Sequence, residues 1–113
     1  LTTDTSTLTA VSNDLGFEQI FERQIEALVT HHDIVWALSV SGTSPNVVRG
    51  LHAAHRKKAT VIGFTGASAN GFEQLCDWCF RVDHASSDRV QEVHQLAYHL
   101  ICDEVETHFS QRD

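Results

Sequence analysis

Three short apolar runs alternate with helical patterns along the chain, and this alternation constrains the fold more than any other feature. The runs are "IVWALSV" at 34–40, "ATVIGFTG" at 59–66 and "WCFRVD" at 78–83. Their shortness and their bounding turns predict strands, and the first two are continuously apolar, as buried strands are. Strands that alternate with helices form a parallel sheet with right-handed crossovers. We therefore predict an α/β fold in three layers, with a parallel sheet flanked by helices.

The helical patterns between the runs differ in strength. "FEQIFERQIEALV" at 17–29 places its apolar residues at helical spacing. Ser44-Pro45 opens another helix, because serine favours the N-cap and proline the first helical position. A long helix is expected from Ser87 to Phe109, with an apolar face turned toward a core. Shorter helices are predicted at 5–16, capped by Thr5 or Ser6, and at 70–77.

The composition excludes several classes of function. The chain has 113 residues, which suits one domain, and 15 acidic against 8 basic residues give a formal net charge of -7. That charge argues against a nucleic-acid partner, which needs a basic surface. No apolar run approaches membrane-spanning length, so no membrane partner is expected. Three cysteines in an ordinary composition favour a reducing, cytoplasmic location over a disulfide scaffold.

The start of the chain and its strand count suggest a part of a longer protein. The sequence begins at Leu1 and contains no methionine, whereas a natural product would keep its initiator methionine before a leucine. Three strands also make a thin sheet for an α/β domain. We therefore expect that further strands precede Leu1 in the parent protein.

The stretch "SVSGTS" at 39–44 is the strongest candidate for a binding site. It carries four hydroxyl groups and one glycine between a predicted strand and a predicted helix. Ligands of open parallel sheets bind beyond the carboxyl ends of the strands, and helix N-termini attract anions. The nucleotide patterns GxxxxGK[ST] and GxGxxG are absent, which favours a phosphorylated metabolite and no nucleotide cofactor. The alternative is a polar turn with one capping serine, and local spacing leaves both open.

Two further patterns are candidates for chemistry. Cys76 and Cys79 form a CxxC, but at a helix end, where no dipole lowers a thiol pKa, so we interpret them as buried structural cysteines. On the last helix, Gln91, Gln95 and His99 follow one another at intervals of four and are expected to share one face. A half-exposed polar stripe is the alternative. His94 is assigned to another face, as a surface or packing histidine.

Together, these residues resemble the sugar isomerase (SIS) domain family and, within it, the bacterial phosphoheptose isomerases. The stretches that carry the resemblance cover almost the whole chain in family order: "LTTDTSTLTAVSND", "SVSGTSPNVV", "VIGFTG" and "RVQEVHQLAYHLICDEVE". The resemblance implies that residues 1–113 are the C-terminal part of a single SIS domain, without its N-terminal helices and first strands. It also implies aldose–ketose interconversion of sedoheptulose 7-phosphate and D-glycero-D-manno-heptose 7-phosphate, in heptose biosynthesis toward lipopolysaccharide precursors.

The family's site residues map onto particular positions of this sequence. The resemblance implies that Ser39, Val40, Ser41 and Ser44 bind the sugar's phosphate end, and that Asn13, Asp14 and Gln91 are further substrate contacts. Gln91 and His99 are implied as catalytic residues and as ligands of a Zn²⁺ ion. The family's glycine-rich loop, and the histidine and glutamate on the helix after it, have no counterpart in this sequence. The catalytic set is therefore incomplete, and the chain alone is expected to be inactive.

Two other functions stay open beside the isomerase. A non-catalytic SIS module would bind a sugar phosphate or a replication-initiator partner, and an amino-sugar enzyme is a third, weaker reading. The presence of both Gln91 and His99 favours the enzyme. The family usually forms tetramers with sites at subunit interfaces, and the apolar last helix likewise favours a homo-oligomer.

Overall fold

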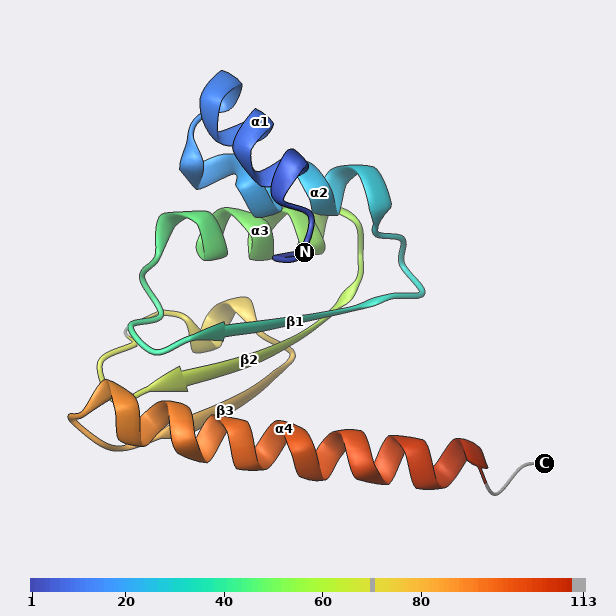
Figure 1. Cartoon of the computed structure of the whole chain (residues 1–113). Coiled ribbons are helices and arrows are strands. Elements are labelled where there is room, and N and C mark those ends of the chain that lie inside the picture. The colour runs from blue at the N-terminus through green and yellow to red at the C-terminus, as the bar shows by residue number, and fades with distance from the viewer. Residues whose placement is uncertain (70, 111–113) are drawn as a thin grey trace.

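The computed structural model describes residues 1–69 and 71–110. Helices and strands alternate along the chain as the sequence predicts (Figure 1). The described elements, with η for 3₁₀ turns, are α1 (Thr5–Leu15), η1 (Phe17–Gln19), α2 (Ile20–Leu28), β1 (Ile34–Ser39), α3 (Pro45–Arg56), β2 (Thr60–Gly66), η2 (Glu73–Leu75), β3 (Trp78–Val82) and α4 (Ser87–Ser110).

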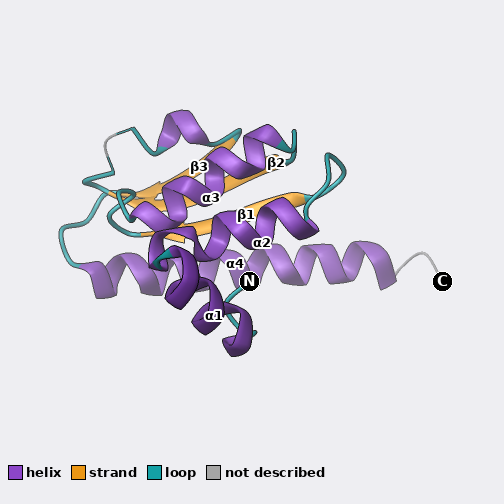
Figure 2. Cartoon of the chain, turned by 90° about the horizontal axis from the view of Figure 1, so that it is seen from above, coloured by secondary structure: helices purple, strands orange, loops and turns teal. Residues whose placement is uncertain are grey.

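The strands form a parallel sheet in the order β1-β2-β3. In its register Ile34 pairs with Thr60, and Phe64 of β2 lies beside Phe80 of β3. Helices α2 and α3 cover one face of the sheet, α1 lies outside them, and α4 lies on the opposite face (Figures 1 and 2). The predicted α/β architecture, a parallel sheet between helical layers, is confirmed.

The core lies between the sheet and α3. Leu51 of α3, Val61 of β2 and Phe72 are almost fully buried there, together with Ile25 of α2. On the other face, the Phe64 ring meets Trp36 and Phe80 edge to face, with centroids 5.1 and 5.0 Å apart. β2 is the central strand and is covered on both faces, which agrees with the prediction of a buried strand from its continuously apolar sequence.

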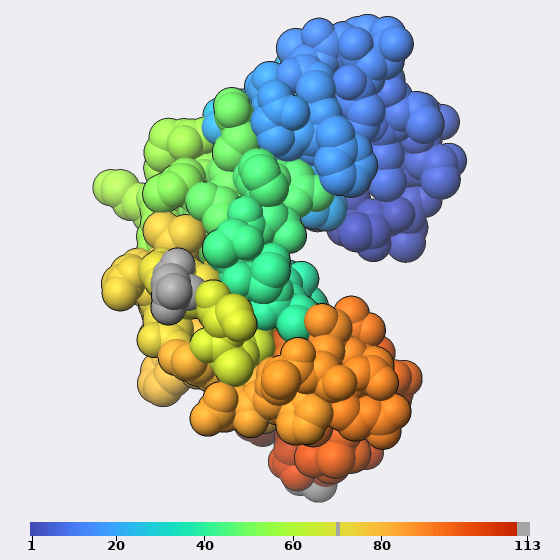
Figure 3. Space-filling view, turned by 90° about the vertical axis from the view of Figure 1, so that its left-hand side faces the viewer, coloured from blue at the N-terminus to red at the C-terminus, as the bar shows by residue number. Residues whose placement is uncertain are grey.

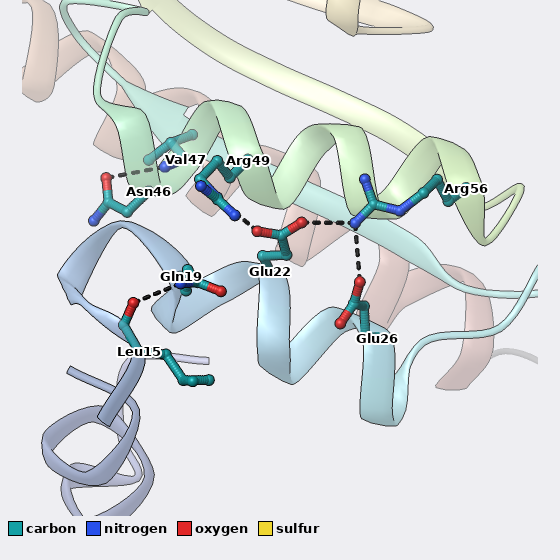
Figure 4. A network of polar contacts seen from close by, with 8 residues as sticks. All are labelled: Leu15, Gln19, Glu22, Glu26, Asn46, Val47, Arg49 and Arg56. Carbon is teal, nitrogen blue, oxygen red and sulfur yellow. Dashed lines mark hydrogen bonds and ion pairs between the residues drawn. The ribbon is translucent and has the colours of Figure 1, made fainter. Parts of the chain in front are cut away.

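Ion pairs join α2 to α3 on the outer surface (Figure 4). A Glu22 oxygen lies 2.6 Å from Arg49 Nε, and its other oxygen lies 2.7 Å from Arg56 Nη2. Glu26 accepts a second contact from Arg56 at 3.0 Å. The hydrogen bonds from Arg49 and then Arg56 lower the pKa of Glu22 below its ordinary value. The two helices are therefore fixed in register by charge as well as by packing.

Helix boundaries differ from the predictions at two places. Helix α1 is capped by Asp4 instead of Thr5 or Ser6, because the Asp4 carboxylate accepts hydrogen bonds from the backbone N and Oγ1 of Thr7. The helix expected at 70–77 is reduced to η2, and residue 70 lies outside the described residues. Cys76 already has extended backbone angles there, so the chain turns early into β3.

The last helix departs most from the expected burial. Of α4, only Val90 and His94 are buried by the described part of the chain. The predicted core-facing residues Leu96, Leu100 and Val105 are more than half exposed, and α4 projects beyond the strands (Figure 1). No helix within residues 1–69 and 71–110 has the length and apolar character needed to cross a bilayer.

Candidate functional site

A cleft of about 770 Å³ lies where the strands end. Figure 3 views this face: the turn after β1 (green) lies above the beginning of α4 (orange). One wall is the turn, with Ser39, Val40, Ser41 and Ser44, and continues into Asn46 and Val47 of α3. The opposite wall is α4 with the loop before it, which contributes His84, Ser87, Gln91, His94, Gln95 and Tyr98.

The serine turn, residues 39–44, is held by its own hydrogen bonds. Ser39 Oγ accepts from Gly42 N at 3.2 Å, and Ser41 Oγ accepts from Thr43 N at 3.3 Å. Ser41 Oγ and Ser44 Oγ lie 3.5 Å apart. Gly42 has φ +64°, a conformation that favours glycine and lets the chain reverse. The turn thus gathers several hydroxyls within a few residues.

Ser44 does not act as the simple capping residue that the alternative reading required. It occupies the N-cap position of α3, but its side chain makes no capping hydrogen bond. Instead, Val47 N donates to Asn46 Oδ1 at 2.9 Å. The Ser44 hydroxyl is therefore not used as a cap and lies beside the Ser41 hydroxyl.

The end of β2 supports the serine turn from behind. Thr65 is fully buried, and its Oγ1 donates to the Ser39 carbonyl oxygen at 2.8 Å. Gly66 N donates to the Val40 carbonyl at 3.0 Å. A Cβ at Gly66 would lie 2.8 Å from that carbonyl, so the close approach of the two strand ends requires glycine there.

Five predicted site residues come together in the cleft, and three do not. Ser39, Val40, Ser41, Ser44 and Gln91 line it. Asn13 and Asp14 lie exposed at the end of α1, outside that lining, where Asn13 Nδ2 donates to Asp14 Oδ1 at 2.8 Å. His99 is also exposed and outside the lining, with its ring 4.6 Å from the Tyr98 ring.

The positions of His94 and His99 follow from helix geometry. Four residues turn a helix by about 400°, so a direction drifts by about 40° at each step of four. His99 follows Gln91 by two such steps of four residues, so its side chain leaves the helix in a direction away from the cleft. Steps of three and four, in contrast, bring His94, Gln95 and Tyr98 to the same side as Gln91. The assignment of His94 to a different face was wrong, although it is a packing histidine.

Several lining residues were missed by the sequence analysis. Successive helical steps of three and four residues from Gln91 would have found His94 and Tyr98. Asn46 lies in the first turn of the helix that follows the serine turn, and this position would have predicted it as a lining residue. His84 and Ser87 carry no signal beyond their position after β3, at the same edge of the sheet as the turn.

The cysteines do not form a reactive site. Cys76 is partly buried, and its Sγ donates to the Phe72 carbonyl at 3.3 Å. Burial, as the largest cause, raises the pKa of the Cys76 thiol to about 12. All three cysteines are free, and Cys79 is exposed, which corrects its predicted burial. A thiol with a raised pKa is a poor nucleophile at neutral pH, so the structural interpretation holds for Cys76.

The described side chains offer few ligands for a metal ion. Within residues 1–69 and 71–110, no group of three or more His, Cys, Asp or Glu residues is arranged to hold a metal ion. A zinc site needs at least three protein ligands, whereas Gln91 and His99 supply two. These residues alone therefore do not fit a complete zinc site.

The comparisons with known proteins agree with this geometry. The SIS domain family model matches residues 1–66. The phosphoheptose isomerase of Nitratidesulfovibrio vulgaris is 48% identical over 102 residues, which cover 90% of this chain and 49% of that protein. The phosphoheptose isomerase of Rhodospirillum rubrum is 46% identical over 106 residues, which cover 94% of this chain and 56% of that protein. The chain thus spans about half the length of the curated relatives it matches.

Solved structures show the same likeness in three dimensions. The phosphoheptose isomerase of Neisseria gonorrhoeae superposes with a TM-score of 0.86 at 38% identity, covering 89% of this chain and 57% of that one. The phosphoheptose isomerase of Francisella tularensis gives a TM-score of 0.86 at 36% identity, covering 90% and 55%. By its family model, its sheet topology and these neighbours, the chain belongs to the SIS domain family.

Proposed function

We propose that the full-length protein is a sugar-phosphate isomerase that interconverts sedoheptulose 7-phosphate and D-glycero-D-manno-heptose 7-phosphate. One observation carries the proposal: the serine turn and Gln91 line one cleft at the carboxyl ends of parallel strands. The relatives are named phosphoheptose isomerases, which supports a phosphorylated heptose as the substrate. The pathway would be heptose biosynthesis toward lipopolysaccharide precursors, in the cytoplasm.

In this proposal the serine turn binds the phosphate end of the sugar. The hydroxyls of Ser41 and Ser44 donate hydrogen bonds to phosphate oxygens. The positive end of the α3 dipole and its backbone N–H groups also attract the phosphate. Gln91, on the opposite wall, binds a sugar hydroxyl through its amide. The volume of the cleft lies within the range of about 300–1,000 Å³ that is typical of small-molecule pockets.

Aldose–ketose exchange moves a proton between neighbouring carbons through an enediol, which requires a positioned acid and base. Gln91 can orient the substrate and stabilise the oxyanion, whereas an imidazole can transfer the proton. We assign that role to His99, in a site that residues outside this cleft complete. Asn13 and Asp14 are proposed as further substrate contacts of such a completed site.

Zinc and self-association belong to the same proposal. A Zn²⁺ ion on Gln91 and His99 would polarise the substrate carbonyl, with its remaining ligands from outside the described residues. A homotetramer is supported by the exposed apolar residues of α4, among them Leu96, Leu100 and Ile101. Assembly through α4 would place His99 at an interface.

A non-catalytic SIS module is the second candidate. Among the described residues, the lining of the cleft contains histidines and amides but no carboxylate, the usual partner base of an isomerase. A module that only binds a sugar phosphate would need no such base. Both candidates would bind a sugar phosphate, but only the isomerase would convert it.

Turnover and binding of the full-length protein separate these outcomes. We expect conversion of sedoheptulose 7-phosphate to the heptose phosphate, followed by chromatography. The Ser41→Ala/Ser44→Ala variant should bind the substrate about 5- to 150-fold more weakly in calorimetry, the range for buried partners left unpaired. Thr43→Ala is the matched control, because Thr43 lies in the same turn but outside the lining. Binding without turnover would favour the module, and equal affinity of the serine variant would contradict the phosphate site.

A further inference from the structure

His94 connects α4, β2 and the cleft. It is 3% exposed, although most of α4 is open. Its Nε2 lies 3.0 Å from the carbonyl oxygen of Thr65 at the end of β2. A carbonyl oxygen can only accept a hydrogen bond, so Nε2 carries the hydrogen and donates it. In the neutral ring, Nδ1 is then left with a lone pair and acts as an acceptor.

The Nδ1 atom of His94 is the ring nitrogen without a hydrogen bond. Among the described residues, Trp36 Nε1 is the only fully covered side-chain nitrogen or oxygen without a partner. The one hydrogen bond that the structure gives the His94 ring is made by Nε2, so Nδ1 is neither bonded nor fully covered. His94 lines the cleft, and the Phe64 and Phe80 rings, with centroids 5.4 and 6.1 Å away, pack around its imidazole. His94 therefore brings an unpaired ring nitrogen to the wall of the cleft.

Thr65 ties this nitrogen to the serine turn. The Thr65 carbonyl accepts from His94, and the Thr65 hydroxyl donates to the Ser39 carbonyl at 2.8 Å. Thr65 is itself fully buried and cannot shift without disturbing the sheet. Two hydrogen bonds through one rigid residue thus fix the position of Nδ1 relative to the turn.

We propose that His94 positions the substrate: Nε2 fastens α4 to β2, while Nδ1 accepts a hydrogen bond from a hydroxyl of the sugar phosphate. The inference rests on the proposed function, because it requires a ligand with a phosphate on the serine turn and a hydroxyl near α4. A hydrogen-bond acceptor at this position favours ligands that carry a hydroxyl group. Inorganic phosphate bound on the serine turn has no sugar hydroxyl to offer this nitrogen. His94 would thereby contribute to discrimination between a sugar phosphate and free phosphate.

Two substitutions in the full-length protein separate the roles of the two ring nitrogens. His94→Gln keeps an amide donor near the position of Nε2 and removes the acceptor at Nδ1. His94→Asn keeps a polar group near Nδ1 but is too short to reach Thr65. His52→Gln is the control, because His52 is exposed on α3 and outside the cleft.

We expect His94→Gln to bind sedoheptulose 7-phosphate roughly 3- to 10-fold more weakly, the scale of one hydrogen bond. Its affinity for inorganic phosphate and its melting temperature should stay near those of the parent. His94→Asn should lower the melting temperature, because the contact with Thr65 is lost. The control should match the parent in every measurement.

A second measurement needs no substitution. In protein labelled with ¹⁵N in its histidine rings, sedoheptulose 7-phosphate should shift the Nδ1 resonance of His94, whereas inorganic phosphate should leave it unchanged. If the parent binds the sugar phosphate but neither this resonance nor the affinity of His94→Gln changes, the inference is wrong and the proposed function survives. If the parent binds no sugar phosphate, both are wrong.

Discussion

Within the serine turn, Gly42 is the residue for which the structure gives the most specific prediction of how a substitution changes stability. It has φ +64°, which an alanine adopts only with strain. A Cβ at this position would come within 2.9 Å of Phe72 Cβ and 3.0 Å of Ala69 Cα, and closer still to Ala69 Cβ. Phe72 and Ala69 are 1% and 3% exposed, so neither can move aside into solvent. Gly42→Ala therefore combines backbone strain with a clash against the core.

The two contributions can be estimated separately. The left-handed conformation costs a non-glycine residue about 1–2 kcal/mol. Overpacking of a filled core costs about 1–3 kcal/mol more. We therefore expect Gly42→Ala to lower the free energy of unfolding by about 2–5 kcal/mol, a large part of the ~5–15 kcal/mol of a typical domain.

Gly71 provides a matched control for the backbone term. It has φ +87°, but a Cβ there would meet only Gln74 Oε1, at an ordinary 3.5 Å. Gly71→Ala should thus cost only the conformational strain. Urea unfolding of both full-length variants should show Gly42→Ala to be the less stable by about 1–3 kcal/mol. Equal stability of the two variants would refute the reasoning, because the clash would then carry no cost.

The remaining predictions concern titratable groups. Because burial raises the pKa of Cys76 from 9.0 to about 12, its thiol stays protonated at pH 8, and iodoacetamide should modify it more slowly than exposed Cys102. Equal rates in the folded protein would contradict this, and urea should remove the difference. The lowered pKa of Glu22 contributes stability that is present above its ordinary value of 4.5 and lost as the pH falls through the lowered pKa. Glu22→Gln should therefore cost roughly 1 kcal/mol at pH 7 and reduce the acid dependence of unfolding, whereas Glu26→Gln, with one partner, should cost less.

The parts of the fold that depend on local pattern were predictable. The run at 34–40 became β1 and the run at 59–66 became β2, because continuous apolar residues bounded by turns have few other solutions. The predicted burial was wrong for β1, where Ile34 and Leu38 are exposed. The serine turn was predictable from local pattern as well: hydroxyls after a strand and before Pro45 lie at the carboxyl edge of a parallel sheet. The lining of the cleft was predictable where its residues were adjacent in sequence.

The parts that depend on distant contacts were not. Leu100 and Val105 look like core residues by pattern, yet their burial depends on what packs against α4, and the described residues do not reach them. The helix expected at 70–77 is reduced to a 3₁₀ turn because the backbone is already extended at Cys76, just before β3. His99 was misplaced because a count of four residues exceeds one helical turn, a small error that grows along the helix. His94 was assigned to another face because a step of three residues from Gln91 was not considered.

The overhang of α4 has a consequence for its own order. His94 is the last buried residue of α4, and the helix continues for 16 further residues to Ser110, or about 24 Å at 1.5 Å per residue. Helices of about this length are marginal in water without tertiary contacts. Amide hydrogen exchange should therefore be slow from Val90 to His94 and become progressively faster toward Ser110 wherever no partner surface covers it. The exchange gradient along this one helix would report, residue by residue, how far a covering surface extends.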